Sequence, residues 1–205
     1  MEILNVFNKD YEKIGTASRE EVHTKGYWHE TFQCWIVGME ENPYIVLQKR
    51  SHTKKEFPDL LDISAAGHLT AGETMEDGVR ELEEELGVTV HYSQLYSCGV
   101  YKDGITIGSM KDNELANIFL YKLAGNIQSF QLQQEEVAAI VKADLHDFIA
   151  LWRGDKQRIV VQGYTERLDR TRAAVTWQVS KSHFVPHGSH YYLYVAEQAK
   201  EYLHQ

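Results

Sequence analysis

The order of apolar and polar positions along the chain predicts strands and helices that alternate. Residues 2–8 and 12–17 are expected to form a hairpin around the polar turn Asn8-Lys9-Asp10. Further strands, the first two rich in aromatic and β-branched residues, are predicted at 30–39, 43–50, 61–66, 89–101, 118–123 and 137–141. Helices are expected over 75–86 and near 144–153, 165–181 and 189–203. This mixture predicts an α/β (α+β) protein.

The helix predicted over 75–86 carries four carboxylates in its last turns, within the run Arg-Glu-Leu-Glu-Glu-Glu-Leu-Gly of residues 80–87. The C-terminal end of a helix has partial negative charge, so each acid there costs a few tenths to about 1 kcal/mol. Three of the acids share one face at spacing i, i+3, i+4: Glu81, Glu84 and Glu85. A divalent cation on that face would offset the repulsion, and oxygen ligands favour Mg²⁺, with Mn²⁺ as the alternative. A solvated acidic face is the other interpretation of such a run.

The stretch around this helix resembles the Nudix box, whose pattern is G-x5-E-x7-R-E-U-x-E-E-x-G-U with U aliphatic. Its fixed positions are filled by Gly67, Glu73, Arg80, Glu81, Leu82, Glu84, Glu85, Gly87 and Val88. One departure is present, because six residues rather than seven separate Glu73 from Arg80. In a continuous helix this rotates Glu73 by about 100° from the carboxylate face. Gly78, a poor residue for a helix interior, marks where the first turn can adjust.

The resemblance implies the Nudix fold, a mixed β-sheet sandwiched between helices, here with an additional C-terminal helical segment. Residues 1–28 are expected to be an N-terminal hairpin extension packed on the core. The Nudix domain is expected over 29–155, and a C-terminal helical extension over 156–205. The resemblance also implies that Glu81, Glu84 and Glu85 hold Mg²⁺.

Outside the box, residues 10–145 are similar to the isopentenyl-diphosphate-isomerase-like branch of the family, in the stretches 23–32, 46–51 and 62–68. In the isomerases, two early histidines, the histidine after the box glycine and a downstream acidic pair ligate a metal. His29 and His68 match such positions, and Asp112-Asn113-Glu114 resembles the acidic pair. His23 lies six residues before His29, where the isomerase pattern has seven.

Two features favour hydrolysis over isomerisation. The isomerases use a cysteine directly before the Gly-His pair, and here that residue is Ala66, which has no proton to give. The isomerases also tend to lose most of the box carboxylates, whereas this chain keeps Glu81, Glu84 and Glu85. The sequence thus predicts a hydrolase built on an isomerase-like chain.

Several residues are candidates for substrate binding. Arg50, Lys54 and Lys55 match basic residues that hold the diphosphate in the isomerases, although a solvated loop is an equal alternative for the lysines. His68 can contact phosphate or ligate a metal, or it is a plain loop histidine. His29 is a candidate for the same contacts, with a hydrogen-bonded structural histidine as the alternative.

The catalytic base is expected to be a carboxylate. Glu84 and Glu85 are the candidates within the box, and Glu135 of the Glu135-Glu136 pair is the candidate beyond it, because family members often carry a Glu-Glu pair there. Glu114 competes for that role and is also a candidate metal ligand. The aromatic and histidine residues of the C-terminal part are expected to pack a core rather than line a pocket: Trp177, Phe184, His187, His190, Tyr191, Tyr192 and Tyr194.

Length, composition and net charge limit the kinds of partner expected for this chain. With 205 residues and 43% hydrophobic content, the chain can form one substantial domain with an extension. A net charge of −9 argues against a nucleic-acid polymer as partner. No 18-residue apolar run is present and residues 1–5 show no secretion signal, so no membrane partner is expected. Cys34 and Cys98 are expected to be buried thiols in a reducing, cytoplasmic compartment, and a homodimer is left open.

The predicted function is Mg²⁺-dependent cleavage of a phosphoanhydride bond in a nucleoside diphosphate-linked or related organic diphosphate. Two alternatives remain open from the sequence. One is an isopentenyl-diphosphate-isomerase-like enzyme, and the other is a non-catalytic module that binds a diphosphate ligand.

Overall fold

The computed structural model of the chain describes residues 2–167 and 169–205. Its strands are β1 (Ile3–Phe7), β2 (Lys13–Ser18), β3 (Trp28–Met39), β4 (Pro43–Arg50), β5 (Leu61–Asp62), β6 (Ala65–His68), β7 (Tyr96–Ile107), β8 (Met110–Lys122), β9 (Val137–Asp144), β10 (Ile159–Glu166) and β11 (Arg172–Val179). Its helices are α1 (Arg19–Lys25), α2 (Arg80–Leu86), α3 (Leu145–Arg153) and α4 (Ser189–Leu203). Short 3₁₀ turns lie at η1 (Asp77–Val79), η2 (Tyr92–Gln94), η3 (Ile127–Ser129) and η4 (Lys181–His183).

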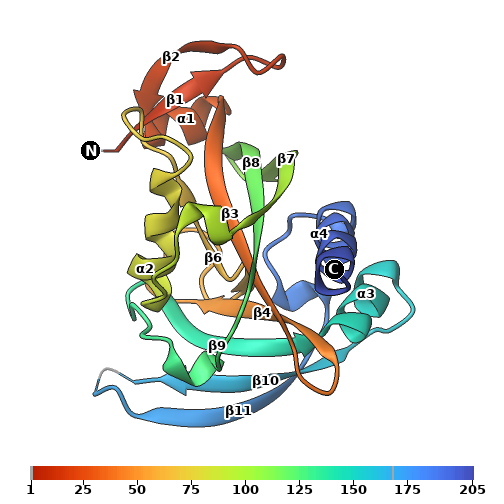
Figure 1. Cartoon of the computed structure of the whole chain (residues 1–205). Helices are drawn as coiled ribbons and strands as arrows, with labels where there is room; N and C mark the ends of the chain where they lie inside the picture. Colours follow the sequence, from red (N-terminus) through yellow and green to blue (C-terminus); the bar gives the residue numbers. More distant parts are fainter. Residues whose placement is uncertain (1, 168) are drawn as a thin grey trace.

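The strands form one mixed sheet in which β3 is the strand that reaches the most neighbours (Figure 1). The order along the sheet is β11-β10-β9-β4-β3-β1-β2, and β8 pairs with β3 in parallel while β7 pairs with β8. The first half of β3 lies between β6 and β8, with Thr31 opposite His68 on one side and His29 opposite Glu114 on the other. Residues that are far apart in the sequence therefore meet along this half of β3.

Helices cover both faces of the sheet. Successive side chains of β3 point to opposite faces, so this strand contributes apolar side chains to a core on each side. Trp35 contacts the rings of Phe148 on α3 and Tyr191 on α4. Its neighbour Cys34 belongs to the separate core beneath α2, which includes Leu82. Figure 1 shows α2 on one side of the sheet and α3 with α4 on the other. The predicted fold class, a mixed sheet between helices with a C-terminal helix, is confirmed.

The predicted strands are present with shifted ends. The strand expected at 61–66 is divided into β5 and β6, and the strand expected at 89–101 begins only at Tyr96. The helices predicted near 144–153 and over 189–203 correspond to α3 and α4.

The prediction of a helix over 165–181 is wrong, because this segment forms most of the β10–β11 hairpin. β10 pairs with β9 and extends the central sheet, so tertiary pairing overrides the local preference. Glu166 holds the turn by accepting hydrogen bonds from Arg170 and Arg172, both at 2.8 Å. The C-terminal extension thus contains strands as well as α4, and the domain boundaries at 29 and 155 stay predictions.

The helix of the acidic run begins later than predicted, at Arg80 rather than residue 75. The 3₁₀ turn η1 precedes it, and Gly78 in that turn lies directly against the ring of Phe32, where a Cβ atom would overlap the ring. Thr74 and Asp77 form a capping contact before this turn, with the Thr74 N–H donating to Asp77 Oδ2 at 2.8 Å. The close approach of backbone to core explains why a glycine stands inside this segment.

An unpredicted helix, α1, follows the N-terminal hairpin. Ser18 caps it by accepting a hydrogen bond from the Glu21 N–H, and Gly26 ends it in the left-handed conformation with φ of 70°. This helix turns His23 toward the first half of β3. Within the described ranges, no helix has the length and apolar character that crossing a membrane requires.

Candidate functional site

An inner pocket of about 270 Å³ opens where α1, α2, β3, β6 and β8 meet. Its wall includes the three carboxylates of the box, Glu114 and Arg50. A larger outer chamber of about 940 Å³ continues from it and shares part of its wall, including Arg19, His23 and Lys54. A ligand held in the inner pocket therefore has space to extend outward.

Two of the box carboxylates are buried in the wall of the inner pocket. Glu85 accepts hydrogen bonds from the Ala66 N–H at 3.2 Å and from Gln48 Nε2 at 3.1 Å. Burial, together with the charge of Glu81, raises the pKa of Glu85 to about 8. Burial raises the pKa of Glu81 to about 7 even though Arg80 lies beside it. The positive charge beside these two buried carboxylates is too small to keep them ionised at their usual pKa, and a cation in the pocket would supply the missing charge.

The third box carboxylate, Glu84, is exposed at the pocket mouth and accepts a hydrogen bond from Arg80 Nη1 at 3.1 Å. The positions of Glu81, Glu84 and Glu85 thus match the face expected from the i, i+3, i+4 spacing. Glu81 also lies against the backbone of Gly67, where a Cβ atom would overlap its carboxylate. The box glycine therefore makes room for the Glu81 carboxylate.

Glu73 braces the loop before α2 in spite of the shorter spacing. It accepts hydrogen bonds from the Thr70 N–H at 2.7 Å and from Arg80 Nε at 2.5 Å, and these contacts lower its pKa to about 2, with Arg80 as the main cause. Arg80 also donates from Nη2 to the backbone carbonyl of His68 at 3.1 Å. Residues 73–79 are turns rather than helix, so the missing residue does not rotate Glu73 away from Arg80.

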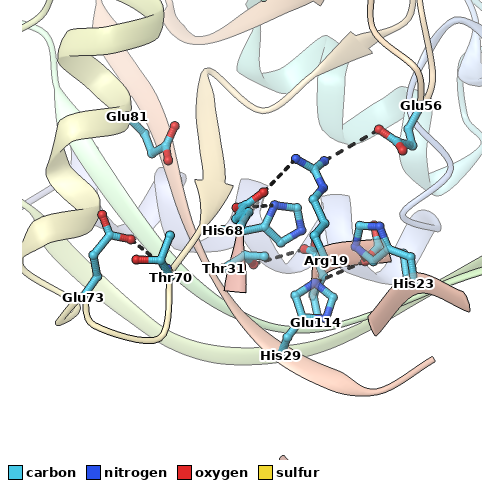
Figure 2. A network of polar contacts seen from close by, with 12 residues as sticks. Arg19, His23, His29, Thr31, Glu56, His68, Thr70, Glu73, Glu81 and Glu114 are labelled. Atoms are coloured by element: carbon cyan, nitrogen blue, oxygen red, sulfur yellow. Dashed lines mark hydrogen bonds and ion pairs between the residues drawn. The ribbon is translucent and has the colours of Figure 1, made fainter. Parts of the chain in front are cut away.

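A second group of side chains that could ligate a metal adjoins the same pocket, and we call it the histidine cluster: His23, His29, His68 and Asp112. One ligand atom from each lies within 4.8 Å of the others, and Figure 2 shows the three imidazoles converging beside Glu114. The four residues come from α1, β3, β6 and β8.

The ring nitrogens and the oxygen that face one another in this cluster form no hydrogen bond among the described residues, although Nε2 of His23 and of His29 each lie 3.4 Å from Asp112 Oδ1. The atoms concerned are Nε2 of each histidine and Oδ1 of Asp112, and all are buried. His29 donates from Nδ1 to the Tyr27 carbonyl at 3.1 Å, which leaves the lone pair of Nε2 directed at the cluster. Burial lowers the pKa of both His29 and His68, so these imidazoles are neutral, as metal ligands must be. Three nitrogens and one carboxylate fit a transition-metal ion such as zinc or manganese better than Mg²⁺.

Residues 28–164 match the model of the NUDIX domain family. The chain belongs to the Nudix family. An uncharacterized Nudix hydrolase of Clostridium acetobutylicum is 36% identical over 192 residues, which is 93% of each chain. Nudix hydrolase 3 of Arabidopsis thaliana is 37% identical over 145 residues, covering 68% of this chain but only 19% of the plant protein. Isopentenyl-diphosphate Delta-isomerase 2 of Photorhabdus laumondii is 36% identical over 87 residues, 42% of this chain and 48% of the isomerase.

Solved structures agree on the fold. The crystal structure of a Deinococcus radiodurans protein superposes with a TM-score of 0.57 and 16% identity, covering 76% of this chain and 91% of that chain. The NUDIX domain of NrtR from Shewanella oneidensis, solved with ADP ribose, superposes with a TM-score of 0.50 and 15% identity, covering 85% of this chain and 87% of that chain. At these identities the likeness concerns the fold alone.

In this Nudix chain, the candidates Glu114 and Arg50 both line the inner pocket. Glu114 accepts hydrogen bonds from Gln33 Nε2 at 2.7 Å and Thr31 Oγ1 at 3.1 Å, and burial with the nearby Asp112 raises its pKa to about 8. Arg50 donates from Nη1 to Asp62 Oδ2 at 2.8 Å. Its Nε donates to the Glu56 carbonyl at 3.1 Å, so the guanidinium is fixed on one side.

The remaining candidate residues lie at different places around the two cavities. Lys54 forms an ion pair with Glu136, and both line the inner pocket and the outer chamber. Glu135 is exposed and lines only the outer chamber. His29 is fully buried, which suits a cluster ligand better than a contact with substrate.

The C-terminal aromatic residues mostly pack the core, as predicted: Tyr191 and Tyr192 are fully buried there. His187 is different, because its ring lies in the wall of the inner pocket between Asp62 and Asp103. No spacing in the sequence signals this contact, since His187 is 125 residues from Asp62 and 84 from Asp103. Gln33 orients Glu114 through a hydrogen bond. It was missed from the sequence for the same reason, since it lies 81 residues from Glu114.

Proposed function

We propose that this protein is a divalent-cation-dependent hydrolase that cleaves the phosphoanhydride bond of a nucleoside diphosphate-linked or related organic diphosphate. The observation that carries the proposal is the pair of buried, undercompensated carboxylates, Glu81 and Glu85, that face a pocket beside the exposed Glu84. The similarity to the Nudix hydrolases of Clostridium acetobutylicum and Arabidopsis thaliana supports it.

Glu81, Glu84 and Glu85 would hold Mg²⁺ or Mn²⁺, and Glu114 is a further oxygen donor on the same pocket. When bound, such an ion neutralises phosphate charge and makes water more acidic. Arg80 keeps the face in place, since its guanidinium touches Glu73, Glu81 and Glu84.

A carboxylate accepts the proton of the attacking water. Glu84 suits this step because its carboxylate is exposed at the pocket mouth, within reach of a water molecule. Beyond the box, Glu136 is better placed than Glu135, because Glu136 lines the inner pocket and Glu135 does not. Glu85 is fixed by Ala66 and Gln48 and serves as a ligand.

The basic residues orient the substrate. Arg50, Lys54 and His68 line the inner pocket, and the two basic side chains can bind the diphosphate. Of the described residues that line the outer chamber, none is Phe, Tyr or Trp, and most are charged or carry a hydroxyl group. This lining favours a polar, hydroxyl-bearing group beyond the diphosphate over a prenyl chain.

A second candidate is an isomerase-like reaction on an isoprenoid diphosphate. The observation that favours it is the histidine cluster next to Glu114, since this set resembles the isomerase metal ligands. Against it stands Ala66, which lies in the wall of the inner pocket and has no proton to donate.

A screen for hydrolysis products with Mg²⁺ tests the proposal, with inorganic phosphate, pyrophosphate and phosphomonoesters separated by ion-exchange chromatography. The panel comprises nucleoside di- and triphosphates, sugar nucleotides, dinucleotides and prenyl diphosphates, each with and without EDTA. We expect Mg²⁺-dependent product formation from at least one compound with a polar group beyond the diphosphate, and an internal phosphoanhydride should give two phosphomonoesters. Proton exchange into isopentenyl diphosphate in D₂O, without phosphate release, would instead establish the isomerase-like reaction. Ligand-induced thermal stabilisation with no product from any compound would contradict both.

A further inference from the structure

The segment between β11 and α4 enters the active-site wall, although it lies beyond the region that matches the family model. Val185 donates its N–H to the Leu61 carbonyl at 2.9 Å, and Phe184 forms a parallel bridge with Leu61. This pairing sets the segment beside β5 and aims His187 at the inner pocket, which Val185 and His187 both line.

Both ring nitrogens of His187 bond to buried carboxylates. Nδ1 lies 2.5 Å from Asp103 Oδ2, and Nε2 lies 3.1 Å from Asp62 Oδ1. Since ionised carboxylates only accept hydrogen bonds, both nitrogens must carry protons, and the ring is an imidazolium. Burial opposes this charge, but the two bonds prevail and raise the pKa of His187 to about 10.

Asp62 connects this imidazolium to the residue expected to bind phosphate. Its Oδ1 faces His187 and accepts the Ile63 N–H at 2.9 Å, while its Oδ2 accepts Arg50 Nη1 at 2.8 Å. Cation and carboxylate therefore alternate along a buried chain of four residues, Arg50, Asp62, His187 and Asp103, with no net charge.

We propose that His187 is a positioning residue through which the C-terminal extension completes the active site, because it fixes Asp62 and thereby holds Arg50 ready for the substrate's diphosphate. Asp62 shares its charge between two cations, so Arg50 keeps positive potential toward the pocket. Without His187, Arg50 alone compensates Asp62, Asp103 loses its partner, and the four-residue chain becomes net negative. A phosphate group then meets a weaker attraction. The inference rests on the proposed function in one respect, namely that Arg50 binds phosphate.

A double-mutant cycle tests this coupling with inorganic pyrophosphate and Mg²⁺ as the probe, measured by calorimetry. We expect Arg50→Ala and His187→Gln each to weaken binding about tenfold, the size typical of a lost charge-assisted contact. The double variant should be no more than about threefold weaker than Arg50→Ala alone, since one residue acts through the other. Independent effects that multiply to about a hundredfold would overturn the proposal, as would unchanged binding by His187→Gln.

Three variants separate positioning from folding. His190→Gln changes an exposed histidine three residues further along and should bind pyrophosphate like the wild type. His187→Lys restores the cation and should recover most of the binding lost in His187→Gln. Asp103→Asn keeps the cation and Asp62 but removes one negative charge, so the four-residue chain becomes net positive, and this variant should bind pyrophosphate at least as tightly as the wild type even if His187→Gln fails to fold. Clearly weaker binding by Asp103→Asn would contradict the proposal.

A ligand-free measurement keeps this inference distinct from the proposed function. The Arg50 Nε–H gives a side-chain NMR signal that reports its hydrogen bond to the Glu56 carbonyl. In His187→Gln the signal should shift and exchange faster with water. An unchanged signal would refute the positioning role even in a protein that binds no pyrophosphate. A changed signal without pyrophosphate binding would support the role of His187 and contradict only the proposed function.

Discussion

The inner pocket brings together two candidate cation sites that are built in opposite ways. The glutamate face, formed by Glu81, Glu84 and Glu85, comes from one helix and offers only oxygen atoms, one carboxylate being open to solvent. The histidine cluster comes from four elements and offers three nitrogens and one oxygen, all buried. The first suits a hydrated Mg²⁺ that exchanges with substrate, and the second suits a tightly held transition metal.

This difference indicates which of the two candidate cation sites turnover should depend on. Glu84 lines the inner pocket and is open to solvent, whereas the ligand atoms of the histidine cluster are buried and His29 is fully buried. We therefore expect turnover to depend most directly on the glutamate face. The histidine cluster should matter first for metal content.

The largest expected effect follows from Glu85→Gln, which removes one charge from the glutamate face. Turnover on the substrate identified by the screen should fall by about a hundredfold to a thousandfold, because charge stabilisation by a bound metal contributes several kcal/mol. Steady-state kinetics with Mg²⁺ measures the change. The thermal midpoint in EDTA should not fall, since burial already disfavours the charged form of Glu85.

Glu83→Gln is the matched control. It makes the same substitution in the same helix at an exposed position that the inner pocket does not include. It should leave turnover within about twofold, as surface changes usually do. If Glu84→Gln and Glu85→Gln each kept turnover within about tenfold of the wild type, the assignment of the metal to this face would be wrong.

The two sites also differ in how far the sequence could predict them. Glu81, Glu84 and Glu85 are fixed by helical spacing counted from Arg80, so their common face needed no knowledge of the fold. The loop before them was harder, because only the structure shows that turns at 73–79 let Glu73 meet Arg80.

The histidine cluster depends on the pairing of strands. His68 and His29 were candidates by resemblance, but His23 reaches them only because of the unpredicted α1, which Ser18 and Gly26 cap at its two ends. Asp112 arrives through the parallel pairing of β8 with β3. The β10–β11 hairpin was missed for the same reason, since its strands are determined by pairing with β9 rather than by local preference.

A smaller effect is expected when the histidine cluster loses a ligand, as in His68→Gln. Wild-type protein dialysed against Co²⁺ should retain about one equivalent with the visible absorption of a nitrogen-ligated ion. The variant should bind Co²⁺ at least about a hundredfold more weakly, more than the loss of an outer hydrogen bond would give. His146→Gln, at a side chain that is 63% exposed, is the control and should retain the ion. Equal Co²⁺ retention by both variants would show that the cluster is not a metal site.

The smallest effect concerns the contact between Glu73 and Arg80, which we call the brace. It supports both sites, since Arg80 also donates to Glu84 and to the His68 carbonyl. Contact with Arg80 lowers the pKa of Glu73 from the usual 4.5 to about 2. A carboxylate whose pKa is lower in the folded than in the unfolded protein stabilises the fold at pH values above its unfolded pKa. That stabilisation is lost as the pH falls through the folded pKa of about 2. Glu73→Gln should therefore cost about 1 kcal/mol at pH 7, because water screens this partly exposed pair.

Urea unfolding across the pH range checks this prediction and also sharpens the comparison of the two sites. The gap between wild type and Glu73→Gln should be constant from pH 7 to about 5 and close between about 4.5 and 2. Glu76→Gln, an exposed residue in the same loop, should show no gap at any pH. Because the brace touches His68 only through its backbone carbonyl, Glu73→Gln should leave Co²⁺ retention nearly unchanged while Mg²⁺-dependent turnover falls. Equal losses in both would mean that the glutamate face and the histidine cluster act as one unit rather than two.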